Sequence, residues 1–67
     1  MPIRVLLLPD RKELLIESGI SIRDLLKVLE LDESDALVVV NSEVVNDASR
    51  KLSEVDDVKV VRVGSGG

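Results

Sequence analysis

The sequence contains no cysteine, no histidine and no aromatic residue. Without thiols and imidazoles, the chain has no disulfide, no thiolate nucleophile, no imidazole base and none of the usual transition-metal ligands. Without aromatic rings, it lacks the platforms on which proteins stack the bases of single-stranded nucleic acids. The acidic stretches "DESD" and "VDD" lack the ligand spacing of a calcium loop. These absences argue against a metal site and against acid–base catalysis by the chain itself.

The chain has 67 residues, and 45% of them are hydrophobic. A domain of this size buries only roughly 60% of the surface that its unfolded chain exposes. Ordering the chain costs on the order of 100 kcal/mol. Most of the Val, Leu and Ile residues must therefore enter one core, which leaves little to wall a deep pocket. We expect one domain that is not an enzyme.

Acidic residues outnumber basic ones by thirteen to nine, and the formal net charge is −4. Because phosphate neutralisation dominates nucleic-acid binding, nucleic acid is a poor partner for this balance. Basic or mixed protein surfaces are better partners, although mild acidity also serves solubility alone. The first ten residues hold a short apolar run that Asp10 ends, which predicts neither a signal peptide nor a membrane span. Stability without disulfides fits a reducing interior, so we expect a cytoplasmic protein.

The chain begins with the pattern of a β-hairpin. Residues 3–8 form an apolar run that Pro9 and Asp10 close with turn chemistry. Residues 13–17 form a second strand, and the "PDRK" stretch between the two runs predicts a four-residue loop.

Residues 21–31 carry the pattern of an amphipathic helix. The apolar positions 22, 25, 26 and 29 fall at i, i+3, i+4 and i+7, on one face of an α-helix. Ser21 occupies the N-cap position, and Asp24 three residues later approximates a capping box and complements the helix dipole. The helix is expected to extend to about Leu31, before the polar "DESD" stretch.

The rest of the chain predicts three strands. Residues 36–40, "ALVVV", are apolar on both faces, which predicts a strand inside a sheet, covered or paired on both sides. Asn41 and Ser42 form a turn into a short strand at residues 43–45. Residues 46–57 form a polar connection with one helical turn around residues 49–52, and residues 58–63 form the last strand. The predicted order is β-β-α-β-β-β, with one helix to cover one mixed sheet.

Four stretches carry a resemblance to a known family: "ESGISIRDLL", "VVNSEVV", "EVDDVKVV" and "GSGG". With the order of elements, they resemble the α+β, β-grasp fold of the ubiquitin superfamily, and more specifically the ThiS and MoaD type of sulfur-carrier protein. Ser42 and Val55 stand where that family has turn glycines. Because valine does not easily take a positive φ, the turn before the last strand should differ locally. We expect a β-grasp domain at residues 1–63 and a flexible glycine-rich tail at residues 64–67.

The end of the chain, "GSGG", suggests that the reactive group is the Gly67 carboxylate. An α-carboxylate has a pKa of about 3.5, so it is ionised at neutral pH and resists nucleophiles until it is activated. Activation as an acyl-adenylate needs ATP and Mg²⁺, which a separate enzyme must supply. Attack by a sulfur donor then gives a thiocarboxylate, and attack by an amine gives an amide or isopeptide.

The composition of the tail suits entry into a partner protein. Glycines lack a Cβ atom, so the backbone fits a narrow channel. In extended form, four residues reach about 13 Å beyond the last strand. The residues expected to thread into the partner are Gly64, Ser65 and Gly66, ahead of Gly67. Alternatively, the tail has no role, because chain ends fray and such stretches are typical of flexible linkers.

A docking surface for that partner is the second requirement. The last strand is apolar on both sides, with residues 58 and 60 on one face and residues 61 and 63 on the other. Two leucines of the first strand and one of the second are also apolar, so they carry no polar group that would favour an exposed position. We predict an exposed docking patch from some of these side chains, the alternative being that all are buried. The candidate patch residues are Leu6, Leu8, Leu15, Val61 and Val63.

The resemblance implies a sulfur carrier whose Gly67 becomes a thiocarboxylate, with thiazole formation for thiamin as its use. The implied partners are a ubiquitin-activating-like adenylating enzyme, a sulfur donor of the desulfurase or rhodanese type, and a downstream synthase such as thiazole synthase. No cofactor is expected on the chain itself, since ATP and Mg²⁺ are used by the partner, and neither nucleic acid nor membrane is an expected partner. Three alternatives stay open: a carrier for molybdenum cofactor or tRNA thiolation, a covalent modifier of lysines, and a non-covalent interaction module.

Overall fold

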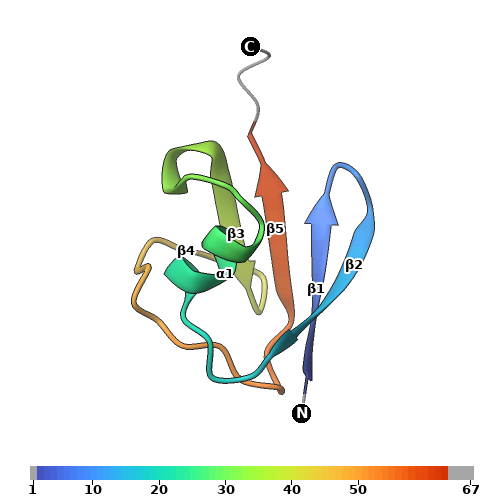
Figure 1. Cartoon of the computed structure of the whole chain (residues 1–67), viewed down its shortest axis with the longest axis vertical. Helices are drawn as coiled ribbons and strands as arrows, with labels where there is room; N and C mark the ends of the chain where they lie inside the picture. Colours follow the sequence, from blue (N-terminus) through green and yellow to red (C-terminus); the bar gives the residue numbers. More distant parts are fainter. Residues whose placement is uncertain (1, 64–67) are drawn as a thin grey trace.

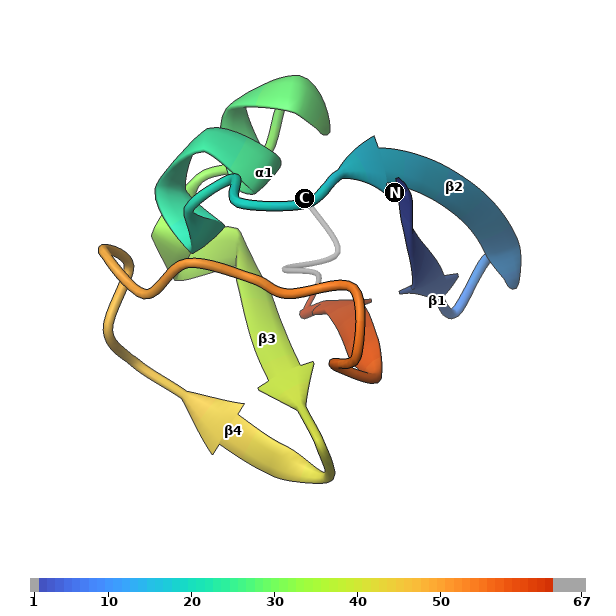
Figure 2. The same ribbon diagram turned by 90° about the horizontal axis from the view of Figure 1, so that it is seen from below.

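The computed structural model of the chain describes residues 2–63, which form a five-stranded sheet with a helix against one face (Figures 1 and 2). The strand order is β2-β1-β5-β3-β4. This mixed sheet with one main helix confirms the predicted β-grasp fold. The elements are β1 (Pro2–Leu8), β2 (Lys12–Glu17), α1 (Ile22–Val28), the 3-10 helix η1 (Glu33–Asp35), β3 (Ala36–Val40), β4 (Glu43–Val45) and β5 (Val58–Arg62).

The centre of the sheet joins segments from opposite ends of the chain. β1 and β5 pair in parallel, with Val5 opposite Val58 and Leu8 opposite Val61. All the other neighbouring strands of the sheet are antiparallel. The C-terminal end of β5 therefore lies beside the turn between β1 and β2 (Figure 1).

The core fills the space between α1 and the facing side of the sheet. Alternate residues of each strand point to that side, because successive side chains of a strand face opposite ways. Within residues 2–63 no polar or charged residue is buried, and no helix has the length and apolar character that a membrane crossing requires. The buried residues are Ile3, Val5, Ile22, Leu25, Leu26, Ala36, Val38, Val40, Leu52, Val58 and Val60.

The loop of the β1–β2 hairpin has the predicted four residues but lies one residue earlier than predicted. Leu7 and Lys12 form the last pair of the two strands, so residues 8–11 lie between them and Lys12 is the first residue of β2. Arg11 has a φ of 59°, in the left-handed region. The residue preference of Arg11 carries no sign of this conformation, so the sequence could not place the boundary.

Helix α1 begins where predicted and ends earlier. The Ser21 hydroxyl accepts a hydrogen bond from the Asp24 N–H at 3.1 Å, which confirms Ser21 as the N-cap. The helix ends at Val28, because Glu30 takes a φ of 59° and donates its N–H to the carbonyl of residue 27. The Leu31 N–H reaches back to the carbonyl of residue 26, which completes a Schellman motif without a glycine. The predicted extension to about Leu31 is therefore wrong.

The connection from β4 to β5 contains no helical turn at residues 49–52, contrary to the prediction. This segment runs beside the entry to α1 instead: the Leu52 N–H donates to the Ile20 carbonyl (2.9 Å), and the Gly19 N–H donates to the Leu52 carbonyl (2.7 Å). Ser21 and Lys51 form an isolated antiparallel bridge. The extended path carries the Leu52 side chain into the core, where it is 2% exposed.

Strand β3 is interior to the sheet, as predicted, but only one of its faces is covered. Ala36, Val38 and Val40 are buried on the helix side. Leu37 points to the other face and is 42% exposed. The prediction that β3 is covered or paired on both sides holds through pairing, since β3 lies between β5 and β4. Cover by other elements is on one face, because within the described residues helix α1 packs against a single face of the sheet (Figure 2).

The turn between β3 and β4 is confirmed, and it needs two left-handed residues. Asn41 has a φ of 54° and Ser42 a φ of 70°. Val40 and Glu43 pair on either side of them. A two-residue loop with both φ values positive is a type I′ turn, whose twist matches that of the strands it joins. Asparagine accepts this conformation readily, whereas serine takes it at a cost.

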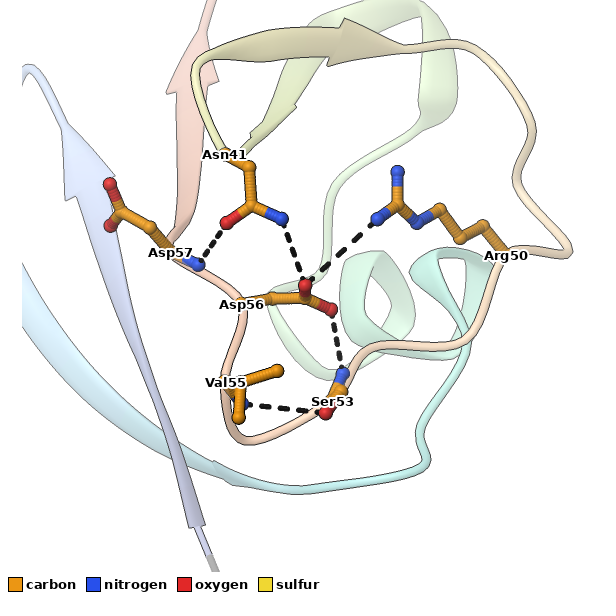
Figure 3. Close-up of polar contacts among 6 residues, drawn as sticks. All are labelled: Asn41, Arg50, Ser53, Val55, Asp56 and Asp57. Carbon is orange, nitrogen blue, oxygen red and sulfur yellow. Dashed lines mark hydrogen bonds and ion pairs between the residues drawn. The ribbon is translucent and has the colours of Figure 1, made fainter.

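A cluster that we call the Asn41–Asp56 clasp holds this turn to the segment that precedes β5 (Figure 3). The Asn41 amide donates to Asp56 Oδ1, and Asn41 Oδ1 accepts from the Asp57 N–H, both at 2.9 Å. The other oxygen of Asp56 accepts from the Ser53 N–H (2.9 Å), and Arg50 lies 4.0 Å from Asp56 Oδ1. The exposed Val55 completes the turn outside the left-handed region, as expected for a β-branched residue.

The left-handed Ser42 predicts a stabilising substitution. In Ser42→Gly, relief of about 1–2 kcal/mol of left-handed strain outweighs the roughly 0.5–1 kcal/mol that glycine loses in chain entropy. The free energy of unfolding, measured with denaturant, is expected to rise by about 0.5–1 kcal/mol. Ser34, exposed in η1 without a positive φ, is the control, and Ser34→Gly should lower stability. Equal loss in both variants would contradict the proposed strain.

The Asn41–Asp56 clasp predicts a dependence of stability on pH. The Ser53 N–H, the Asn41 amide and Arg50 lower the pKa of Asp56. A carboxyl whose pKa is lowered in the folded state stabilises it above the ordinary pKa of about 3.9 and loses that effect as the pH falls through the folded value. The difference in unfolding free energy between wild type and Asp56→Asn should therefore shrink below about pH 4.

Asp47 provides a comparison for that measurement. Its pKa is lowered by hydrogen bonds from the side chain and backbone of Ser49. The double variant with Asp47→Asn and Asp56→Asn should show a flatter pH profile between about pH 2 and 5 than either single variant. A profile as steep as that of the wild type would rule out both carboxylates as its source.

Candidate functional site

The sheet face opposite α1 is the main candidate for a functional surface. All five strands contribute apolar side chains to it, in the alternation that a strand imposes. Leu15 is 69% exposed and Val44 is 55% exposed, while several neighbours are partly buried against one another. We call this surface the open-face patch; it consists of Leu6, Leu8, Leu15, Leu37, Val39, Val44 and Val61.

The strand registers arrange most of the patch in two rows across the sheet. In one row, Leu8 of β1 lies opposite Val61 of β5, which lies opposite Leu37 of β3. In the next row, Leu6 is followed by the partly buried Lys59 and then by Val39. Directly opposed side chains in a sheet lie about 4.5–5.5 Å apart, so each row is a continuous surface.

Four of the five residues proposed for docking come together on this face. Leu6, Leu8 and Val61 sit in the two rows, and Leu15 lies opposite Arg4 on the neighbouring edge strand β2. The fifth, Val63, follows β5, since that strand ends at Arg62 and not at residue 63 as predicted.

Three patch residues were not foreseen from the sequence. Leu37 and Val39 belong to β3, whose apolar run predicted a strand covered or paired on both sides, and Val44 belongs to the short strand β4. Periodicity cannot distinguish a strand buried on both faces from one that exposes an apolar side. The available signal was the count of elements, since one predicted helix cannot cover two faces of a sheet.

Two contacts fix the position of the C-terminal end of the central strand β5. Arg62 Nη1 donates to Asp10 Oδ2 in the β1–β2 turn at 3.2 Å. The Val63 N–H donates to the Asp35 carbonyl of η1 at 3.0 Å. The described part of the chain therefore ends at a defined place, between the β1–β2 turn and η1 (Figure 1).

The predicted reactive group lies outside the described residues. This holds for Gly67 and for the threading residues Gly64, Ser65 and Gly66, as well as for the predicted boundary between domain and tail. Residues 2–63 contain no cluster of three or more carboxylates placed to hold a metal ion. The two carboxyls with lowered pKa, Asp47 and Asp56, accept hydrogen bonds within turns. Among the described residues, the open-face patch is therefore the remaining candidate for a functional surface.

Comparison of the sequence with known proteins identifies the family of this chain. No curated protein matches the chain. The family model described as the ThiS family matches residues 4–67, which includes all of the sheet except the first two residues of β1, and also the Gly-Gly end. Members of this family are small carrier proteins and not enzymes, and membership implies a sulfur-carrier role. Since the match spans nearly the whole sequence and the fold agrees with it, the chain belongs to the ThiS family.

Proposed function

We propose that this chain carries sulfur as a thiocarboxylate on Gly67, after a partner enzyme has activated the carboxylate with ATP and Mg²⁺. The observation that carries the proposal is the family match, which continues through the Gly-Gly end to residue 67. The attachment of the end of β5 to Asp10 and Asp35 supports it, because the tail then leaves the domain from a fixed point.

The chemistry follows from the weak reactivity of a carboxylate. The Gly67 carboxylate attacks the α-phosphorus of ATP, pyrophosphate leaves, and an acyl-adenylate forms on the partner. The outer sulfur of a persulfide on the sulfur donor then attacks the carbonyl carbon and AMP leaves, which joins Gly67 to the donor through an acyl disulfide. A thiol then attacks the donor's sulfur, the S–S bond breaks, the thiocarboxylate is released and the donor is left in a disulfide with that thiol. Stabilising the transferred phosphoryl group takes metal ions and cationic side chains, which the adenylating enzyme contributes. This chain contributes the carbonyl, and glycine at residues 66 and 67 leaves it unshielded on both sides.

Docking to the enzyme is assigned to the open-face patch. Contiguous exposed apolar surface on a small soluble protein marks an interaction site. In this chain the patch extends from Leu15 to Val44 across the whole width of the sheet. The row formed by Leu8, Val61 and Leu37 contains Val61, which lies two residues before the end of the described chain. A partner seated on this face therefore lies close to the end of the described chain.

For the use of the sulfur, we propose formation of the thiazole of thiamin, with a thiazole synthase as the acceptor. Support comes from the match to the ThiS family and from the short chain of 67 residues. Molybdenum cofactor synthesis, tRNA thiolation and attachment to lysines use the same terminal chemistry, so they are outcomes that the experiment must separate.

Mass spectrometry of the full chain purified from its native host tests the proposal. Replacing one carboxylate oxygen by sulfur adds the mass difference between the two atoms, and alkylation of the sulfur adds the mass of the reagent. We expect both shifts to map to Gly67 in wild type. A variant with one alanine added after Gly67 should show neither, because the modified carboxylate is then no longer on glycine 67.

Two results would count against the assignment. Recovery of the chain in conjugates linked to lysines through Gly67 would indicate a covalent modifier. Full support of thiamin-independent growth by the alanine-extended variant, with the extension still present, would show that Gly67 is not the reactive end.

A further inference from the structure

The last residue of β5 is held on the sheet by a side-chain contact. The register of β5 with β3 continues to Arg62, whereas its register with β1 ends one residue earlier, at Val61. On the β1 side, Arg62 Nη1 instead donates a hydrogen bond to Asp10 Oδ2 at 3.2 Å. The two residues are 52 positions apart, so this contact, which we call the Asp10–Arg62 tie, joins the first turn of the chain to the end of its last strand.

The Asp10–Arg62 tie is a well-formed but partly exposed ion pair. Its distance of 3.2 Å is shorter than the 3.9 Å of two other surface pairs. The Arg62 side chain is 51% exposed and that of Asp10 is 34% exposed, so water competes for both and the tie contributes little to the stability of the whole domain. Its effect is expected at the end of β5, because chain ends open locally at a free-energy cost close to zero. A weak contact there changes how often the end is attached.

The turn that presents Asp10 has an unfavourable backbone conformation. Arg11, the next residue, has a φ of 59°, in the left-handed region that residues with a Cβ atom adopt at a cost. Residues kept in such conformations are concentrated at places where the position of a group matters. In this turn, the side chain next to the strained residue is the one that contacts β5.

The tie precedes the last backbone contact of the described chain. One residue after Arg62, the Val63 N–H donates to the Asp35 carbonyl at 3.0 Å. Beyond this point the sequence continues for four residues. If residues 62 and 63 detach from the sheet, a partner that binds the tail must order two more residues, and each costs backbone entropy. The attached form is therefore the one prepared for binding of the tail.

From these contacts we infer that Asp10 is a positioning residue for the reaction at Gly67. It acts through Arg62, by keeping the end of β5 attached to the sheet while a partner engages the residues that follow. The inference rests on the proposed function, which supplies the reaction. By the alternation along β5, Arg62 lies on the same side as the buried Val60, opposite the open-face patch. Loss of the tie should therefore leave docking intact and lower the fraction of docked chains that can react.

Hydrogen exchange of the full-length chain tests the structural step. In Asp10→Asn, which removes the charge but keeps the size of the side chain, the Val63 amide should exchange about two- to fivefold faster. The amide of the buried Leu52, which bonds to the Ile20 carbonyl, should exchange as in the wild type. The control Asp24→Asn makes the same change of charge at an exposed position of α1 and should leave the Val63 amide unchanged. An unchanged Val63 amide in Asp10→Asn would overturn the inference.

Activation by the host adenylating enzyme tests the functional step, followed as exchange of pyrophosphate into ATP that depends on the full-length chain. Asp10→Asn should lower kcat about twofold, and Asp10→Lys, which repels Arg62, about fivefold, because the reactive form is less populated. KM for the chain should stay within about 1.5-fold, since the open-face patch is intact. The double variant Asp10→Asn/Arg62→Gln should be no slower than the slower single variant, because the two residues act as one unit. Asp24→Asn should match the wild type.

The two measurements separate failure of this inference from failure of the proposed function. Faster exchange at Val63 with unchanged kcat would reject the role of Asp10 in the reaction, while the mass shift at Gly67 would still support the sulfur carrier. Absence of that mass shift in the wild type would reject the proposed function and, with it, this inference. A lower kcat in Arg62→Gln but not in Asp10→Asn would indicate that Arg62 contacts the partner directly, which also contradicts the tie.

Discussion

The parallel pairing of β1 with β5 is the contact on which the rest of the structure depends. Val5 and Val58 face each other at its start, and both are fully buried. β2 attaches to the sheet only through β1, whereas β3 and β4 attach through β5. Without the central pair, the sheet would separate into two antiparallel pieces, each with an uncovered edge. The same pairing brings the end of β5 beside the β1–β2 turn, where Arg62 reaches Asp10.

Helix α1 determines which face of the sheet is available for binding another protein. Helix α1 has seven residues and covers one face, on which the core forms. The apolar side chains on the other face are not covered by another element of the described residues, and they form the open-face patch. In the proposed function a partner enzyme activates the carrier, and an uncovered apolar face gives that partner a surface to bind.

The sequence was least informative where ordinary residues take the place of glycine in turns. Arg11, Glu30 and Ser42 all have positive φ values, and none has a residue preference that would reveal them. The end of α1 and the position of the loop in the first hairpin were therefore mispredicted. Asn41 was predicted correctly as a turn residue, but its amide contacts with Asp56 and Asp57 could not be. They join positions about fifteen residues apart, and only the folded chain brings these together.

By itself, the sequence determined the order of elements, the N-cap of α1 and the membership of a carrier family, because local periodicity and capping chemistry are written in neighbouring residues. It also determined that the chain has no thiol or imidazole that could react. The tertiary structure decided which of the apolar residues are covered. Leu37 and Val38 are adjacent and equally hydrophobic, yet one is exposed and the other buried. That difference arises because the sheet has two faces and residues 2–63 provide a helix for only one of them.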